Sequence, residues 1–221
     1  MNDLSLYNAS IRGIPMPPHI QKLPVSPKGF AVPWFVAWVD GVPDFRIVGP
    51  NKIATAHKHK LCWICGERLG RNFAMTLGPM CIINRTISEP PSHRDCAIYA
   101  AKACPFLSNP RMRRNTVGIS DAAYGGAGEG IERNPGVVAV WITRSYRPFK
   151  AFNGVLFTFD DPDEVHWFAE GRTALRSEVE ASINSGIHFL EDAASAEGPS
   201  ALADLSRMTA KARQYLPADL S

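Results

Sequence analysis

Two stretches decide the fold: CWICG at residues 62–66 and HRDC at residues 93–96. Together they form the pattern C-x2-C-x27-H-x2-C. Two cysteines separated by two residues make a tight turn that presents both sulfurs to one point, and the following glycine supplies the permissive backbone that this turn needs. The spacing predicts a zinc site with four ligands, Cys62, Cys65, His93 and Cys96.

The second stretch should open a helix. Ser92 can cap this helix, and Asp95 stands at the reciprocal capping position three residues later. His93 and Cys96 then lie one turn apart on one helical face, and the unpaired N–H groups of the first turn favour a thiolate at Cys96. Four protein ligands fill a tetrahedral shell, so we expect structural zinc, because catalytic zinc keeps one position for water.

Other cysteines and histidines are alternative ligands. Cys81 lies between the two halves of the pattern and Cys104 follows Cys96 by eight residues, so either could replace His93. Both are better explained as buried small apolar residues. His57 and His59 alternate with lysines ahead of the cysteine pair and are second-choice ligands.

The segment between the two halves is expected to form a β-hairpin with strands at 73–77 and 81–87. A cysteine knuckle, a hairpin and a helix that gives two ligands resemble the treble-clef zinc-finger group, over about residues 60–107. A treble clef can frame a nuclease, which implies a general-base histidine at the end of the hairpin. Residues 66–92 contain no histidine, so a nuclease would need His57, His59 or His166.

Three further segments resemble uncharacterised proteins of bacterial and phage genomes. They are LGPMC at 77–81, EPPSH at 89–93 and ACPF at 103–106. This resemblance implies a bacterial or phage cytoplasmic setting and no particular mechanism.

Composition narrows the class of protein. The chain has 221 residues, of which 45% are apolar and 20% charged, as in ordinary globular proteins of one or two domains. Five cysteines cannot pair completely, which disfavours a disulfide scaffold. We find no apolar run typical of a signal peptide or membrane span, so we expect a cytoplasmic protein without a membrane partner. No Walker lysine, Gly-x-Ser-x-Gly elbow or His-Glu-x-x-His helix indicates an enzyme.

Charge is distributed unevenly. Residues 1–154 carry 19 Lys and Arg against 9 Asp and Glu, whereas residues 155–221 carry 5 against 12. A basic half can bind a polyanion, although a solvated face or docking of the acidic half would give the same counts. The candidate nucleic-acid contacts are Arg68, Arg71, Arg94, Lys102, Arg111, Arg113 and Arg114.

The first half of the chain should contain two units. Residues 1–33 hold several prolines and are expected to form an extended arm, and residues 34–114 should hold a hairpin and the zinc module. The hairpin is predicted from strands at 34–39 and 45–48, with a helix or loop at 51–60. Its aromatic residues are expected in the core, with base stacking as the alternative. These are Trp34, Phe35 and Trp38.

Residues 115–136 are a glycine-rich loop, and residues 137–221 should contain strands followed by helices. We expect residues 137–143 to pair with 155–159, and a third strand at 164–169. The acidic run at 160–164 is interpreted as a solvated turn, with a divalent-cation site as the alternative.

The C-terminal pattern is helical. Leu175, Val179 and Ile183 recur every four residues, and Gly186 is placed to end that helix. A short helix should follow at 188–194, and a last one after Pro199, whose inward residues are expected to be Leu202, Leu205 and Ala210.

The sequence therefore predicts an α+β protein in which a zinc-bound treble clef is embedded among antiparallel hairpins, with a helical C-terminal part. The favoured function is binding of nucleic acid or of a protein partner. The alternatives are a divergent metal-dependent nuclease or hydrolase, and a phage-type inhibitor or structural protein that acts through protein contacts.

Overall fold

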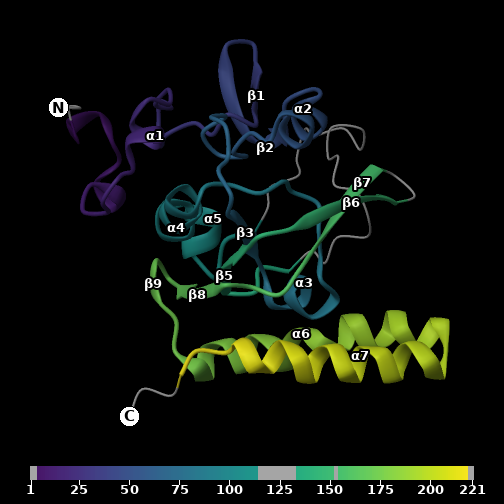
Figure 1. The fold of residues 1–221 in the computed structure, drawn as a ribbon. Helices are drawn as coiled ribbons and strands as arrows, with labels where there is room; N and C mark the ends of the chain where they lie inside the picture. Colours follow the sequence, from purple (N-terminus) through teal and green to yellow (C-terminus); the bar gives the residue numbers. More distant parts are fainter. Residues whose placement is uncertain (1–3, 114–132, 152–153, 219–221) are drawn as a thin grey trace.

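The computed structural model describes residues 4–113, 133–151 and 154–218, which form an α+β fold (Figure 1). Its centre is a four-stranded antiparallel sheet in the order β3-β5-β8-β9. The strands are β3 (Phe73–Leu77), β5 (Val137–Thr143), β8 (Glu164–Ala169) and β9 (Arg172–Thr173). Residues 34–114 and 137–221 thus contribute strands to the same sheet.

Strand β5 is buried on both faces. Val137, Ala139 and Trp141 pack into one apolar cluster, and the alternate residues Val138, Val140 and Ile142 pack into another. The first cluster is covered by α3 (Pro79–Asn84), α6 (Arg176–Glu197) and α7 (Pro199–Ala212), and the second is covered by α4 (Arg94–Ala103). This arrangement explains the unbroken apolar run in the sequence, since a strand covered by helices on both sides has no polar face.

A second sheet has the order β4-β7-β6. Its strands are β4 (Thr86–Ile87), β6 (Tyr146–Ala151) and β7 (Gly154–Phe159). The expected pairing of 137–143 with 155–159 is wrong, because β7 pairs with β6 and β4 while β5 pairs with β3 and β8. Strand β6 is mostly exposed, so its sequence lacks the apolar alternation that would have marked it as the partner.

The expected hairpin after the knuckle is only half present. Strand β3 forms as predicted, but most of 81–87 belongs to α3 and only Thr86 and Ile87 are extended. Pro79 suits the first turn of a helix, where its missing N–H has no helical partner. Strand β3 pairs instead with β5, and Ala74 also forms an isolated antiparallel bridge with Ser92.

The C-terminal helices also differ from the prediction. Helix α6 continues through Gly186 to Glu197, and the left-handed glycine lies at Gly198, with φ of 110°. Gly186 is buried where Met80 and Arg133 approach the helix closely, so packing rather than a turn explains the glycine. In α7 the residues facing the core include Leu205, whereas Leu202 and Ala210 are exposed.

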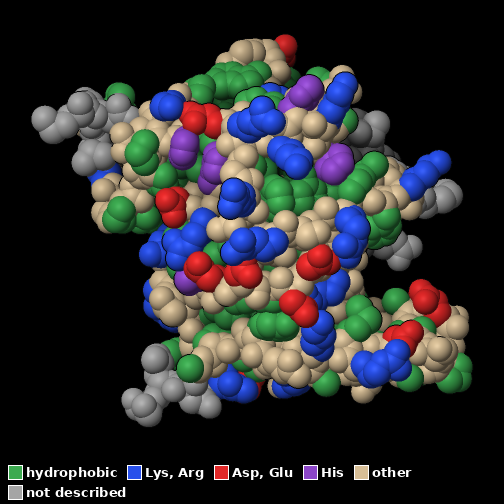
Figure 2. Space-filling view, in the orientation of Figure 1, with side chains coloured by type: hydrophobic (Ala, Val, Ile, Leu, Met, Phe, Trp, Pro, Cys, Tyr) green, Lys and Arg blue, Asp and Glu red, His purple; other side chains and the backbone are tan. Residues whose placement is uncertain are grey.

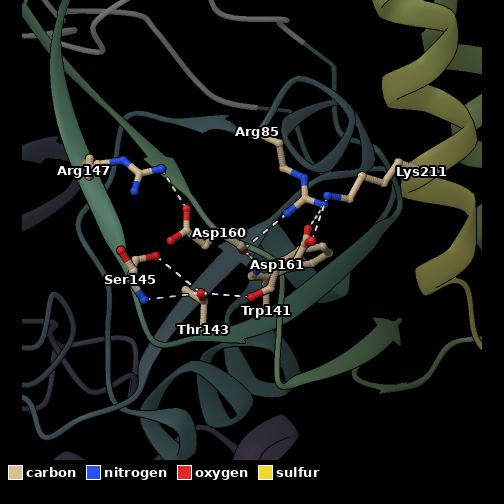
Figure 3. A network of polar contacts seen from close by, with 8 residues as sticks. All are labelled: Arg85, Trp141, Thr143, Ser145, Arg147, Asp160, Asp161 and Lys211. Atoms are coloured by element: carbon tan, nitrogen blue, oxygen red, sulfur yellow. Dashed lines mark hydrogen bonds and ion pairs between the residues drawn. The ribbon is translucent and has the colours of Figure 1, made fainter.

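The acidic run at 160–164 is paired with basic side chains, and Figure 3 shows the pairs of Asp160 and Asp161. Asp161 accepts hydrogen bonds from Arg85 at 2.8 Å and from Lys211 of α7 at 2.7 Å. Because every carboxylate of the run has a cationic partner, these acids do not form a free cation site. The other ion pairs are Asp160–Arg147, Asp163–Arg144 and Glu164–Arg94.

The N-terminal region packs against the segments that carry Cys62, Cys65 and Cys96. It contains 3-10 helices at Leu4–Leu6 and Ala9–Ile11 and the short helix α1 (Pro18–Gln21) rather than extended chain alone. Its residues Tyr7, Ile11 and Ile20 are buried in one apolar cluster with the cysteines of the motif. The elements that follow are β1 (Val36–Val39), β2 (Val42–Val48) and α2 (Lys52–His59), and the remaining ones are α5 (Pro105–Ser108) and the 3-10 helix Arg213–Tyr215.

The predicted hairpin is confirmed as β1–β2, which projects at the top of Figure 1. The expected core role of its aromatics is wrong for Trp38, which is 52% exposed. Within the described ranges, no helix has both the length and the apolar composition needed to span a bilayer.

Candidate metal centre

The first half of the site is a tight turn with its own hydrogen bonds. The Cys62 N–H donates to the Glu67 carbonyl at 2.7 Å, and the Gly66 N–H donates to the Cys62 carbonyl at 2.8 Å. Gly66 has φ of +75°, which confirms the reason for a glycine there. Leu61 and Arg68 form an antiparallel bridge that closes the turn at its base. We call residues 61–68 the knuckle.

The second half of the site is the first turn of α4. His93 itself is the N-cap residue, with extended backbone and no side-chain capping bond, so the predicted capping by Ser92 and Asp95 is wrong. The backbone of Ser92 is engaged in the bridge with Ala74, which fixes the chain entering the helix. A hydrogen bond of 3.0 Å from the Trp63 N–H to the Pro91 carbonyl joins the two halves directly.

The four predicted ligands converge. Their ligand atoms all lie within 4.8 Å of one another, and three of the four residues are buried. The His93 Nδ1 atom lies 3.3 Å from the Cys65 sulfur and 3.9 Å from the Cys96 sulfur. Ligands bound to zinc at its usual distances are separated by about 3.5–3.8 Å in a tetrahedron, so these spacings suit one central ion. The cluster can hold a metal ion.

The orientation of His93 is set by its other ring nitrogen. Nε2 lies 3.0 Å from the Arg68 carbonyl oxygen, and only a protonated nitrogen can make that hydrogen bond. In the neutral ring this hydrogen bond leaves the lone pair on Nδ1, the atom that faces the sulfurs. A backbone carbonyl in this position is a common outer partner of metal-binding histidines.

The N-terminal region supports the same histidine. The His19 ring stacks on His93, with centroids 4.7 Å apart and an angle of 12° between the planes. The Glu67 carboxylate lies 2.7 Å from His19 Nδ1 and accepts a hydrogen bond from Lys22 at 2.8 Å. Helix α1 is thereby attached to the knuckle, an arrangement that the sequence analysis missed because the partners are 45 residues or more apart.

The sulfur environment favours one negative charge in the absence of a cation. Hydrogen bonds from the Cys65 and Cys96 thiols lower the pKa of Cys62, whose sulfur also accepts the backbone N–H groups of Cys65 at 3.4 Å and His93 at 3.3 Å. The proximity of Cys62 raises the pKa of Cys65 to about 11 and raises that of Cys96 as well. Three sulfurs this close can all be thiolates only if a cation lies between them.

The alternative ligands lie outside the cluster. Cys81 and Cys104 are not part of it, and burial raises the pKa of the Cys81 thiol to about 11 and raises that of Cys104. His57 lies 3.2 Å from the Tyr146 hydroxyl, His59 is exposed, and His166 pairs with Glu164. Among the described residues, the ligand group therefore contains only the four predicted side chains.

The predicted basic contacts have different environments. Arg68, Arg71, Arg111 and Arg113 are exposed. Arg94 is bound to Glu164 at 3.0 Å, and the Lys102 ammonium lies 5.6 Å from the centre of the Phe168 ring. Arg114 lies outside the described residues.

Two further basic residues lie beside the knuckle. Lys58 and Lys60 at the end of α2 are exposed, and in the described part of the chain they form no ion pair; the same holds for Arg68 and Arg71. The Leu69 N–H donates to the Lys60 carbonyl, so both sides of the knuckle carry basic residues. We call Lys58, Lys60, Arg68 and Arg71 the knuckle patch. Lys and Arg side chains are numerous on the face shown in Figure 2. The alternating sequence KHK at 58–60 is the feature of the sequence that could have predicted these two basic residues as part of the surface.

No protein-family model, no curated protein and no solved structure matches this chain. Its function is therefore inferred from the chemistry of the site and its surroundings.

Proposed function

We propose that Cys62, Cys65, His93 and Cys96 bind a structural zinc ion. The carrying observation is the convergence of three sulfurs and one imidazole nitrogen within 4.8 Å. Thiolate and imidazole ligands in a tetrahedral set are typical of zinc. The ion would link the knuckle to α4 and supply folding free energy, and four protein ligands favour a structural role over a catalytic one.

The surroundings support a treble-clef-like unit with a changed hairpin. The knuckle, β3 and α4 follow in the expected order, and the bridge between Ala74 and Ser92 gives β3 a short antiparallel partner just before the helix. We infer that the helix α3 occupies the place of the second hairpin strand.

We further propose that the protein binds nucleic acid through the knuckle patch. Among the described residues its four cations have no acidic partner, whereas the acids of the run at 160–164 are paired with other arginines and with Lys211. Exposed cations without an acidic partner favour phosphate, and arginine adds a bidentate donor geometry. The acidic run is therefore not free to mask this patch.

The test compares two double variants that lose the same charge. If the four side chains each meet one phosphate, the affinity for duplex DNA falls with a log–log salt slope of about −3.6. Arg68→Ala with Arg71→Ala should reduce the slope by about 2, because two phosphate contacts are lost. Arg111→Ala with Arg113→Ala removes two exposed arginines elsewhere and should change the slope less.

Zinc content and circular dichroism of both variants establish that they are folded. Equal effects of the two pairs would place the contacts outside the knuckle patch. No binding by the wild type at low salt would overturn the nucleic-acid proposal and favour an acidic protein partner.

A further inference from the structure

An open apolar groove of about 350 Å³ adjoins the knuckle. Its volume is at the lower end of the range for small-molecule sites, and thus suits a single flat ring system better than a folded partner. Two tryptophans and three prolines line it, together with one cation, Lys52. The lining residues used below are Trp34, Trp38 and Lys52.

The hairpin β1–β2 carries two exposed aromatic rings, those of Trp38 and Phe45. Trp38 lies opposite Pro43 in the antiparallel register, and Phe45 is two residues further along β2. The register shifts beyond Asp44, because the next partner after Asp44 is Val48, so Phe45 lies in the irregular part of β2 and does not line the groove. Both rings are open to solvent, Trp38 by 52% and Phe45 by 45%. A buried core would not leave large rings so exposed, and ring faces of this kind bind other flat groups.

The groove is built onto the metal centre. The Trp34 N–H donates to the Ile64 carbonyl of the knuckle at 2.7 Å, and the Trp34 ring packs over Gly66. The Lys52 ammonium lies 3.7 Å from the centre of the same ring. Helix α2 then leads from Lys52 to the knuckle patch at Lys60, a path of about 12 Å at the usual helical rise.

We propose that the nucleic acid is single-stranded, with one base stacked on Trp38 at the groove and the backbone phosphates running along α2 to the knuckle patch. This inference rests on the proposed function. Bases expose their faces only when they are unpaired, so stacking on an aromatic side chain selects single strands. Lys52 and the knuckle patch supply cations, and Trp38 supplies an exposed ring, which are the two features that such sites use. The cations favour this ligand over an apolar peptide.

The experiment measures binding of fluorescently labelled oligothymidylate and of a duplex DNA of equal length, both to the full chain with zinc. The oligothymidylate should bind more tightly than the duplex. Trp38→Ala should weaken oligothymidylate binding about tenfold, the expected effect of losing one stacked base. Duplex binding should stay unchanged, because it uses the phosphate contacts alone.

Two matched variants separate stacking from other effects. Trp38→Phe keeps a ring face and should retain most of the affinity, while losing the quenching of tryptophan fluorescence that stacking causes. Val42→Ala removes an equally exposed apolar side chain from the opposite face of the hairpin and should have no effect.

The outcomes distinguish the two proposals. Equal binding of both DNAs with no effect of Trp38→Ala would overturn the single-strand inference and leave the knuckle patch intact. Failure to bind either DNA at low salt would overturn both. Binding of a proline-rich peptide that is lost in Trp38→Ala, without loss of DNA binding, would make the groove a peptide site.

Discussion

Replacing Gly66 with alanine should destabilise the protein by about 2–5 kcal/mol. A left-handed backbone costs about 1–2 kcal/mol for a residue with a β-carbon. A β-carbon at Gly66 would also lie 2.5 Å from Cγ and Cδ1 of Trp34. Trp34 cannot move aside freely, because its backbone N–H is bound to the Ile64 carbonyl and the Lys52 ammonium lies over its ring. Overpacking of this kind costs a further ~1–3 kcal/mol.

Gly41→Ala is the matched control. Gly41 has φ of +78°, close to that of Gly66, but an added β-carbon would meet no atom within 4 Å. Its cost should be the backbone contribution alone, about 1–2 kcal/mol. Urea unfolding followed by tryptophan fluorescence, at constant zinc concentration, measures both variants. Equal losses would refute the contact between Gly66 and Trp34, and no loss in either variant would refute the left-handed backbone as well.

Two ion-pair sites give further predictions. Arg172 and the Leu175 N–H lower the pKa of Glu178 to about 2, so its stabilisation is present above its ordinary pKa of 4.5 and is lost as the pH falls towards 2. Glu178→Gln should cost about 1 kcal/mol at pH 7 and nothing near pH 2, a convergence measured by urea unfolding at several pH values. Asp161→Asn should lower stability by about 1–2 kcal/mol, because the mostly buried Arg85 loses its carboxylate partner. Lys211→Ala should cost less than about 1 kcal/mol, because its ion pair with Asp161 is exposed. Thermal unfolding compares the two variants, and equal losses of stability would contradict the burial of Arg85 as the cause.

The metal cluster was predictable because its information is local. The cysteine pair lies within one tight turn, and His93 and Cys96 lie within one turn of α4. Only the contact between the cysteine turn and the first turn of α4 involves residues that are distant in sequence. A helix with Ser92 as its cap was predicted; α4 forms, but it begins one residue later, with His93 as its N-cap, because Ser92 pairs with Ala74 in a bridge.

The errors arose where packing between distant segments overrides local pattern. The segment 81–87 is apolar enough for a strand, but most of it folds as α3; β5 pairs along one edge of β3, and Ser92 forms a bridge with Ala74. Gly186 suggested a helix end, although α6 continues through it and the side chains of Arg133 and Met80 pack against it. Strand β6 was not predicted from the sequence, because it is mostly exposed and so lacks a pattern of buried apolar residues.

The surface features were only partly accessible from sequence. Lys58 and Lys60 belong to the predicted basic segment, yet nothing local shows that they lie across the knuckle from Arg68. Likewise, the aromatic residues of β1 predict a core, and only the structure shows that Trp38 projects beyond it. Charge pairing is equally nonlocal, as the bond between Arg94 and Glu164 illustrates.

The central claim is a zinc ion held by Cys62, Cys65, His93 and Cys96. Elemental analysis of the purified protein tests it most directly, with Cys81→Ala as the control for a cysteine outside the cluster. About one zinc per chain is expected in the wild type and in Cys81→Ala, and loss of zinc is expected in Cys65→Ser. A wild type without zinc, or a Cys65→Ser variant with unchanged zinc content, would contradict it.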